Sequence, residues 1–323
     1  MANLLLFNYK PVLITAGIVL GVFLLLMLIC FLFTLLIFKK AFGRSEKTPS
    51  EGNELYKQYD GILKEGEEFF FSLSPEEVYI TSNDNLKLHA YFHETENSIG
   101  TIIFMHGYHG KPVRDFGPVL SLFKELGFSL LLPHQRAHGK SEGKYLTFGV
   151  KESEDCLLWA KYIASRFPGR PISLHGISMG GATVGMASAL DLPKEVQLIA
   201  NDCGFTSPDA IISSVRKSMK LPAFPFQFMV RFLAKTLAKF SLKQKDASIC
   251  YSQSTLPALF IHGEADDFVP FYMGKQNYEK CASQDKILIS VKDAGHALAY
   301  ILDKERVTKE IKDFYLYHMQ KKQ

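Results

Sequence analysis

The segment GISMG at residues 176–180 places Ser178 between two glycines. It directly follows an apolar run at 171–176, which is typical of a strand, and precedes a run of small residues typical of a buried helix. In a strand–turn–helix arrangement, the sharp turn projects the serine hydroxyl from the carboxyl edge of a sheet. The flanking glycines permit the strained backbone of such a turn. The pattern therefore predicts that Ser178 is a nucleophile, and a plain glycine-rich turn is the alternative.

A serine hydroxyl is a weak nucleophile, so Ser178 requires a base and a group that orients this base. Further along the chain, Asp266 follows an apolar run at 258–263, and His296 follows a second run at 286–291. The order serine, acid, histidine is the one expected for this type of nucleophile. We therefore expect His296 to act as general base and then as general acid, with Asp266 orienting its imidazole ring.

Other side chains near strand ends are alternatives for the acid and the base. Asp267 is adjacent to Asp266, but neighbouring residues at a strand end point in different directions. Asp202 ends the apolar run at 196–202 and could also orient a histidine. The remaining histidines near strand ends do not follow the acid as His296 does, and they are His106, His134, His138, His175 and His262.

Ester or amide hydrolysis by a serine also requires two N–H donors for the oxyanion. One expected donor is the backbone N–H of Met179, at the start of the predicted helix, where the helix dipole adds positive charge. The second is expected in the loop HGYHG at 106–110, and we assign it to the backbone N–H of Tyr108, whose ring is expected to line an acyl pocket. No group of histidines, cysteines and carboxylates has metal-ligand spacing.

The elements that must position these residues alternate along the chain from residue 76 onward. Short β-rich runs are separated by longer amphipathic segments, which predicts an α/β fold with a mostly parallel sheet covered by helices on both faces. The first two runs are joined by a turn at 83–85 and are expected to form an antiparallel hairpin. The expected strands lie at 78–82, 86–94, 101–106, 128–133, 171–176, 196–202, 258–263 and 286–291.

Together these motifs resemble the α/β-hydrolase superfamily over residues 76–320, and are similar to its prolyl-oligopeptidase and monoacylglycerol-lipase-like clans. The matching segments are HG at 106–107, RAHGKSEG at 136–143, HGEADDFVP at 262–270, and GH at 295–296. The resemblance implies an α/β-hydrolase fold and hydrolysis of esters, thioesters or amides without a cofactor or a metal. It also implies a helical lid over the active site, inserted at about 206–252.

The expected lid is basic and aromatic. Residues 210–245 contain eight lysines and arginines and no acidic residue, and a basic amphipathic helix is predicted at 227–240. One interpretation is a cap whose apolar face covers the substrate pocket and whose basic face is solvated. A second is that the basic lid also rests on anionic lipid. The residues expected to line the pocket from this lid are Phe224, Phe228 and Phe232.

The N-terminal segment is apolar. No charged residue occurs at 11–38, which is long enough to span a bilayer and longer than the apolar part of a signal peptide. We expect an anchor at 1–40, a polar tether at 41–75 with one short helix around 54–63, and a hydrolase domain at 76–323. More positive charge follows the span than precedes it, which favours a single-pass protein of the cell membrane with a cytoplasmic catalytic domain.

Composition and charge are consistent with this division. The chain of 323 residues is 47% hydrophobic and carries a net charge of +4, which is too small to indicate a nucleic-acid partner. We therefore predict a membrane-anchored serine hydrolase (class EC 3.1.1) that cleaves small-molecule or lipid-like carboxylic esters through an acyl-enzyme. The alternatives are an amidase or peptidase with the same triad and, with less support, a non-catalytic binding protein.

Overall fold

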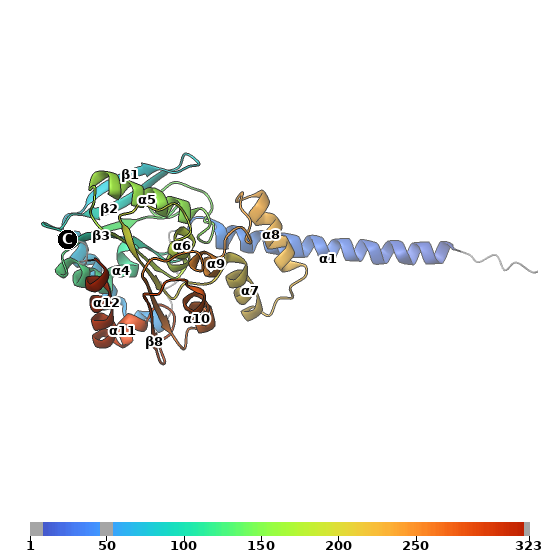
Figure 1. Cartoon of the computed structure of the whole chain (residues 1–323). Helices are drawn as coiled ribbons and strands as arrows, with labels where there is room; N and C mark the ends of the chain where they lie inside the picture. The colour runs from blue at the N-terminus through green and yellow to red at the C-terminus, as the bar shows by residue number, and fades with distance from the viewer. Residues whose placement is uncertain (1–8, 46–53, 320–323) are drawn as a thin grey trace, which may run out of the picture.

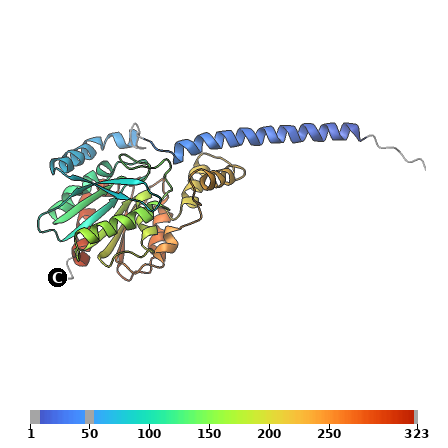
Figure 2. The same ribbon diagram turned by 90° about the horizontal axis from the view of Figure 1, so that it is seen from above.

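The computed structural model describes residues 9–45 and 54–319, and within them eight strands form one sheet with helices on both faces (Figures 1 and 2). The order across the sheet is β1-β2-β4-β3-β5-β6-β7-β8. β1 and β2 form the antiparallel hairpin, β2 is antiparallel to β4, and all other neighbours are parallel. The strands are β1 (Glu76–Thr81), β2 (Lys87–His93), β3 (Gly100–Met105), β4 (Phe128–Pro133), β5 (Ile172–Ile177), β6 (Val196–Asp202), β7 (Ala258–Gly263) and β8 (Lys286–Val291).

The predicted fold class and all eight predicted strands are confirmed. The central strands are buried on both faces because helices cover both sides, so their sequences are continuously apolar. The helices are α1 (Lys10–Phe42), α2 (Glu54–Lys57), α3 (Asp60–Ser72), α4 (Pro112–Glu125), α5 (Glu152–Arg166), α6 (Met179–Ala187), α7 (Pro208–Ser218), α8 (Phe226–Thr236), α9 (Ala247–Tyr251), α10 (Phe271–Lys280), α11 (Ala299–Leu302) and α12 (Lys304–Met319).

Two apolar cores lie on opposite faces of the sheet, because successive side chains of a strand point to opposite sides. In β4, Leu131 belongs to the core that contains α5 and α6, whereas Leu130 and Leu132 belong to the core formed with α3, α4 and α12. The carboxyl ends of the parallel strands therefore meet along one edge, from which the loops that follow β3, β5, β7 and β8 emerge.

The segment expected to be a tether contains packed structure in its described part. α3 lies along α4, and a side-chain carbon added at Gly66 would come 2.3 Å from the backbone of Gly117, so the two helices touch through their glycines. Phe70 is fully buried, and Arg114 of α4 pairs with Asp60 and Glu67 of α3. The part of the expected tether at 46–53 lies outside the described residues. Burial of Phe70 and the glycine contact explain why residues 60–72 form a fixed helix.

The helix expected to be a separate anchor ends inside the body. α1 projects from the body as one continuous helix (Figure 1), but Phe38 and Phe42 at its end are buried and stack with ring centroids 4.2 Å apart. Phe42 also packs on Phe148, and the carbonyl of Gly43 accepts a hydrogen bond from Nε2 of His109. The last turns of α1 are thus core residues of the body.

Candidate active site

Ser178 lies in a sharp turn between β5 and α6, as its motif predicts. Its backbone has φ +55° and ψ −115°, a strained conformation for a residue with a side chain. A side-chain carbon added at Gly176 would come 2.0 Å from the carbonyl oxygen of Gly180, and one added at Gly180 would come 1.7 Å from that of Met105. Both positions therefore require glycine, because the turn is packed directly against backbone.

The structure brings Ser178, His296 and Asp266 together at the carboxyl edge of the sheet. Nε2 of His296 lies 2.9 Å from Oγ of Ser178, and Nδ1 lies 2.7 Å from Oδ2 of Asp266. With the Nδ1–H donating to the carboxylate, Nε2 is left as the acceptor for the serine hydroxyl. The imidazole is partly exposed, whereas the carboxylate is buried. This arrangement can take a proton from Ser178 and hold the resulting imidazolium beside a negative charge.

Asp266 is held in place and kept ionised by its surroundings. Its Oδ1 accepts hydrogen bonds from the backbone N–H groups of Phe268 and Val269, at 3.0 and 2.8 Å. Burial opposes ionisation, but hydrogen bonds with His262 and His296 outweigh it and hold the pKa of Asp266 at about 2. A permanently charged carboxylate fixes the tautomer of His296.

The two backbone amides predicted as oxyanion donors lie in segments that adjoin Ser178. Met179 is the first residue of α6, and Tyr108 lies in the loop after β3. Among the described residues, no backbone acceptor is bound by either N–H. The loop that carries Tyr108 is positioned by Asp115 of α4, whose Oδ2 accepts a hydrogen bond from the N–H of Gly107 at 2.9 Å. Burial raises the pKa of Asp115 to about 6.

The alternative acids and bases occupy other positions. Asp267 is among the residues that line a cavity beside the triad. Asp202 is buried and lines the same cavity with one carboxylate oxygen unpartnered, and burial raises its pKa to about 6. Neither carboxylate is hydrogen-bonded to His296. Of the other histidines, His106, His138 and His262 hydrogen-bond to backbone carbonyls, His134 bonds to His89, and His175 bonds to the Tyr315 hydroxyl.

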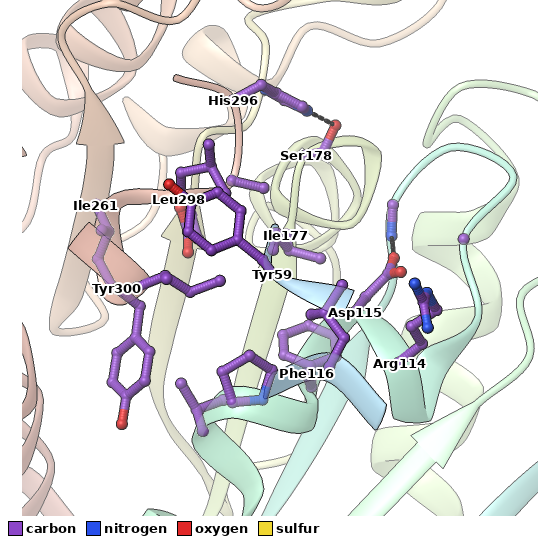
Figure 3. A pocket seen from close by; sticks show the side chains of 18 of the residues that line it. Tyr59, Arg114, Asp115, Phe116, Ile177, Ser178, Ile261, His296, Leu298 and Tyr300 are labelled. Atoms are coloured by element: carbon purple, nitrogen blue, oxygen red, sulfur yellow. Dashed lines mark hydrogen bonds between the residues drawn. The ribbon is translucent and has the colours of Figure 1, made fainter. Parts of the chain in front are cut away.

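A cavity of about 570 Å³ opens from Ser178 and His296. Figure 3 shows it bounded by Tyr59 and Leu298 and extending toward Phe116 and Tyr300. The wall comes from α2 and α3, α4, the end of β5 and the segment around α11. Its apolar side chains include Tyr59, Leu63, Phe116, Val119, Ile177, Ile261, Leu298, Tyr300, Ile301 and Ile311. The site can therefore hold an apolar group next to the serine hydroxyl.

The three phenylalanines expected to line this pocket lie elsewhere, which corrects the sequence prediction. Phe224, Phe228 and Phe232 are exposed by 65%, 65% and 51%, and none borders the cavity. The reason is that α8 packs against α1 and not across the strand edge. Tyr108 does line the cavity, as expected, and stacks on Phe148.

The residues that do cover the cavity come from the segment expected to be a tether. Tyr56, Tyr59 and Leu63 line it, and the Tyr56 hydroxyl donates a hydrogen bond to the carbonyl of His296 at 3.1 Å. Sequence reasoning missed them, although their spacing of three and four residues is a helical apolar pattern that carries this signal. The polar composition of residues 41–75 instead indicated a tether, so this apolar pattern was not recognised.

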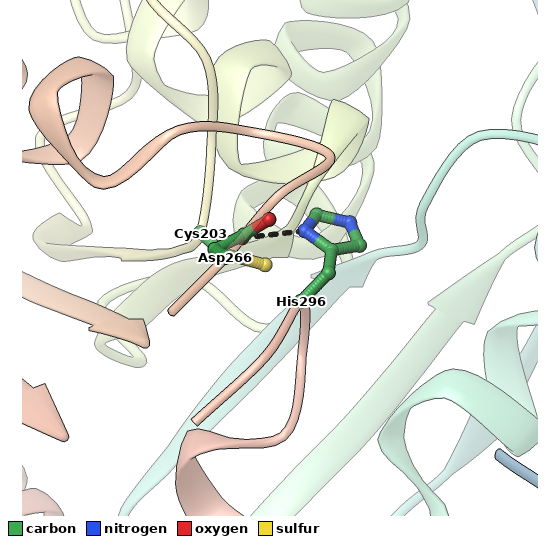
Figure 4. Close-up of side chains that lie close together, drawn as sticks. All are labelled: Cys203, Asp266 and His296. Carbon is green, nitrogen blue, oxygen red and sulfur yellow. Dashed lines mark hydrogen bonds and ion pairs between the residues drawn. The ribbon is translucent and has the colours of Figure 1, made fainter. Parts of the chain in front are cut away.

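A group of potential metal ligands overlaps the same site. Within the described ranges, this group consists of Cys203, Asp266 and His296 (Figure 4). Each residue offers one potential ligand atom, and the three atoms lie within 4.8 Å of one another. The Nδ1 atom of His296 is already bonded to Asp266, and burial beside Asp202 and Asp266 raises the pKa of the Cys203 thiol. These properties fit a proton-transfer site better than a metal site, because a metal needs the thiolate and a free imidazole nitrogen.

Comparison with known proteins agrees with the fold. Residues 96–254 match the family model described as serine aminopeptidase, S33. The esterase PF2001 of Pyrococcus furiosus superimposes with a TM-score of 0.63 and is 25% identical, covering 77% of this chain and 94% of the esterase. This chain belongs to the α/β-hydrolase superfamily. It is thus an enzyme of the hydrolase class.

Two relatives of this α/β hydrolase are informative. It is 28% identical over 218 residues to the lysophosphatidylserine lipase ABHD12 of Danio rerio. The matched region covers 64% of this chain and 52% of the lipase. It is 25% identical over 229 residues to the uncharacterised membrane protein YNL320W of Saccharomyces cerevisiae, covering 71% of this chain and 75% of the yeast protein. Hydrolases and a membrane protein are therefore among the proteins that it resembles.

Proposed function

We propose that this α/β hydrolase is a membrane-anchored serine esterase that cleaves carboxylic esters with apolar acyl groups. The observation that carries the proposal is the chain of hydrogen bonds from Ser178 through His296 to Asp266, which opens on an apolar cavity. The esterase and lipase among its relatives support an ester or lipid-like substrate. The candidate membrane span in α1 supports the anchor, and the basic residues after it favour a cytoplasmic body.

In the proposed mechanism, Oγ of Ser178 attacks the ester carbonyl while Nε2 of His296 takes the hydroxyl proton. The charge on the carbonyl oxygen is stabilised by the N–H groups of Met179 and Tyr108, each expected to lower the barrier by about 3 kcal/mol. His296 then gives its proton to the departing alkoxide, which leaves an acyl group on Ser178. Water activated by His296 releases the acid and restores the serine.

The proposal is tested by labelling the full chain with a fluorophosphonate, which reacts with activated serines. We expect the unmodified chain to be labelled, Ser178→Ala to lose labelling, and Ser252→Ala to keep it. Ser252 is an exposed serine whose hydroxyl bonds to the carbonyl of Ile249 and is a matched control. Persistent labelling of Ser178→Ala would show that another residue is the nucleophile. No labelling of any form would support a non-catalytic binding protein.

A second candidate function is an aminopeptidase that uses the same residues. The description of the matching family model favours it, as does the unpartnered oxygen of Asp202 on the cavity wall, because a carboxylate there can bind a substrate amino group. A panel of p-nitrophenyl esters of increasing chain length, measured beside aminoacyl p-nitroanilides, separates the two. Faster hydrolysis of the anilides would favour the peptidase.

A further inference from the structure

The outer face of α8 is aromatic and unpaired with the body. Phe224, Phe228 and Phe232 recur at intervals of four residues and are exposed by half or more. Phe228 and Phe232 lie on α8 and share one side of it at this spacing, while Phe224 precedes the helix. The opposite side of α8, which includes Met229 and Leu233, is buried. These three large exposed rings, two on one side of α8 and one just before it, form an aromatic stripe with more apolar surface than a water-facing segment normally presents.

α8 is also in direct contact with α1. The ring of Phe226 packs edge-on against Phe33 with centroids 6.0 Å apart, and the Thr34 hydroxyl lies 3.6 Å from the sulfur of Met229. Figure 1 shows α7 and α8 on the side of the body from which α1 projects, with α8 alongside α1. The aromatic stripe therefore lies beside the candidate membrane span and away from the cavity.

The position of this contact along α1 fixes its depth. From Lys10 to Phe33, a helix that rises 1.5 Å per residue extends about 35 Å. A hydrocarbon core is about 30 Å thick, so a span that begins near Lys10 leaves the core close to Phe33. α8 touches α1 at this level, and so lies at the boundary between acyl chains and headgroups.

The charges around the stripe suit a lipid surface. Lys217, Lys220, Lys235, Lys239 and Lys243 are exposed in the same region. Asp209, in the first turn of α7, is already bonded to Arg231 of α8. Long lysine side chains can reach headgroups while rings from the same helix contact acyl chains. Each lysine near an anionic surface adds to the attraction.

We propose that residues 224–239, comprising Phe224, α8 and the turn after it, are a second membrane contact that inserts Phe224, Phe228 and Phe232 into the leaflet at which α1 enters the body. The exposed lysines bind the anionic headgroups of that leaflet. This proposal rests on the proposed anchoring by α1. It assigns to the insertion a role in seating the body on the bilayer, separate from covering substrate.

Tryptophan fluorescence of the full chain, reconstituted in vesicles of phosphatidylcholine and phosphatidylglycerol, tests the contact. Lipids brominated near the headgroup end of the acyl chain quench a tryptophan that inserts at that depth. The chain has one tryptophan, Trp159, which is buried in the body and supplies a constant background. The probes are Phe228→Trp on α8, Leu20→Trp within α1, and Tyr317→Trp on α12 as an exposed control.

We expect brominated lipid to remove about half of the added emission of Phe228→Trp, as for a ring inserted at the boundary, and to leave Tyr317→Trp unchanged. Leu20→Trp should be quenched by lipids brominated deeper in the chain. If Leu20→Trp is not quenched, the anchoring proposal fails. If Leu20→Trp is quenched and Phe228→Trp is not, the second contact is refuted while the anchor stands.

Aqueous iodide completes the test. Quenching of Phe228→Trp by iodide would place the stripe in water, and protection from both quenchers would place it against protein, such as a second copy of the chain; either result overturns the proposal. Phe232→Trp repeats the measurement at an independent exposed site, in case Phe228→Trp does not fold.

Discussion

The segment at residues 54–72 and the insertion at 206–252 have exchanged the roles that the sequence predicts for them. The sequence predicts a tether for the first and a lid over the active site for the second. The first is short and polar in composition, yet Tyr56, Tyr59 and Leu63 cover the cavity beside Ser178. The second is aromatic and basic, as a lid would be, yet its exposed phenylalanines lie beside α1. The composition of a segment indicates how much apolar surface it has. Which part of the molecule covers the cavity depends instead on where each helix packs, which is α4 for α3 and α1 for α8.

The strongest test of this comparison introduces the same bulky side chain into each segment. Leu63→Trp fills the cavity and should lower kcat/KM for long-chain p-nitrophenyl esters by about 100-fold, with a smaller effect on acetate, because a filled apolar pocket excludes extra methylenes. Phe228→Trp, on α8, should leave the chain-length profile unchanged. Equal losses in the two variants would mean that both segments contact the acyl group.

A second test loosens the contact between α3 and α4. In Gly66→Val, the new side chain would collide with the backbone of Gly117, so we expect a loss of about 2 kcal/mol in the free energy of unfolding and reduced discrimination among acyl chains. Gly61→Ala, on the same helix with no neighbour within 4 Å, is the control and should not destabilise. Denaturant unfolding of the full chain in detergent measures both. An unchanged Gly66→Val would show that α3 is not held by this contact.

The third test compares the pH dependence of stability due to Asp115 of α4, the helix against which α3 packs, with that due to Asp209 of the insertion. Burial raises the pKa of Asp115 beside the cavity to about 6 from an ordinary 3.8, so the stability that its protonated form contributes is complete below pH 3.8 and is lost as the pH rises through 6. Asp115→Asn should therefore become more stable relative to the unmodified chain by about 2 kcal/mol between about pH 4 and pH 7.

Asp209, in the insertion, is the matched control for this measurement. Its hydrogen bond with Arg231 lowers its pKa, so the stability it contributes is present above the ordinary pKa of 3.8 and is lost only in more acidic solution. Asp209→Asn should shift stability by a constant amount across neutral pH. Thermal unfolding at several pH values measures both variants, and parallel curves for Asp115→Asn and its parent would contradict the raised pKa.

The sequence predicted those parts of the molecule that depend on local patterns. Each strand is a short apolar run, and Ser178, Asp266 and His296 each follow such a run, so one parallel sheet brings them to one edge. The segment that covers the cavity was not predictable in the same way. Contact of Gly66 with Gly117 and packing of α8 on α1 join residues far apart in the chain, and neither leaves a pattern within its own segment.

α1 is continuous from its exposed part to Phe42 in the core. The body is therefore joined to the candidate membrane span by a rigid helix and not by a flexible linker. The uncharged stretch at 11–38 extends about 40 Å as a helix, which is more than the thickness of a hydrocarbon core, and a helix that is too long for its bilayer can tilt. In the anchored enzyme that we propose, any tilt turns the whole body through the same angle. Bilayer thickness then sets the angle at which the mouth of the cavity faces the lipid surface.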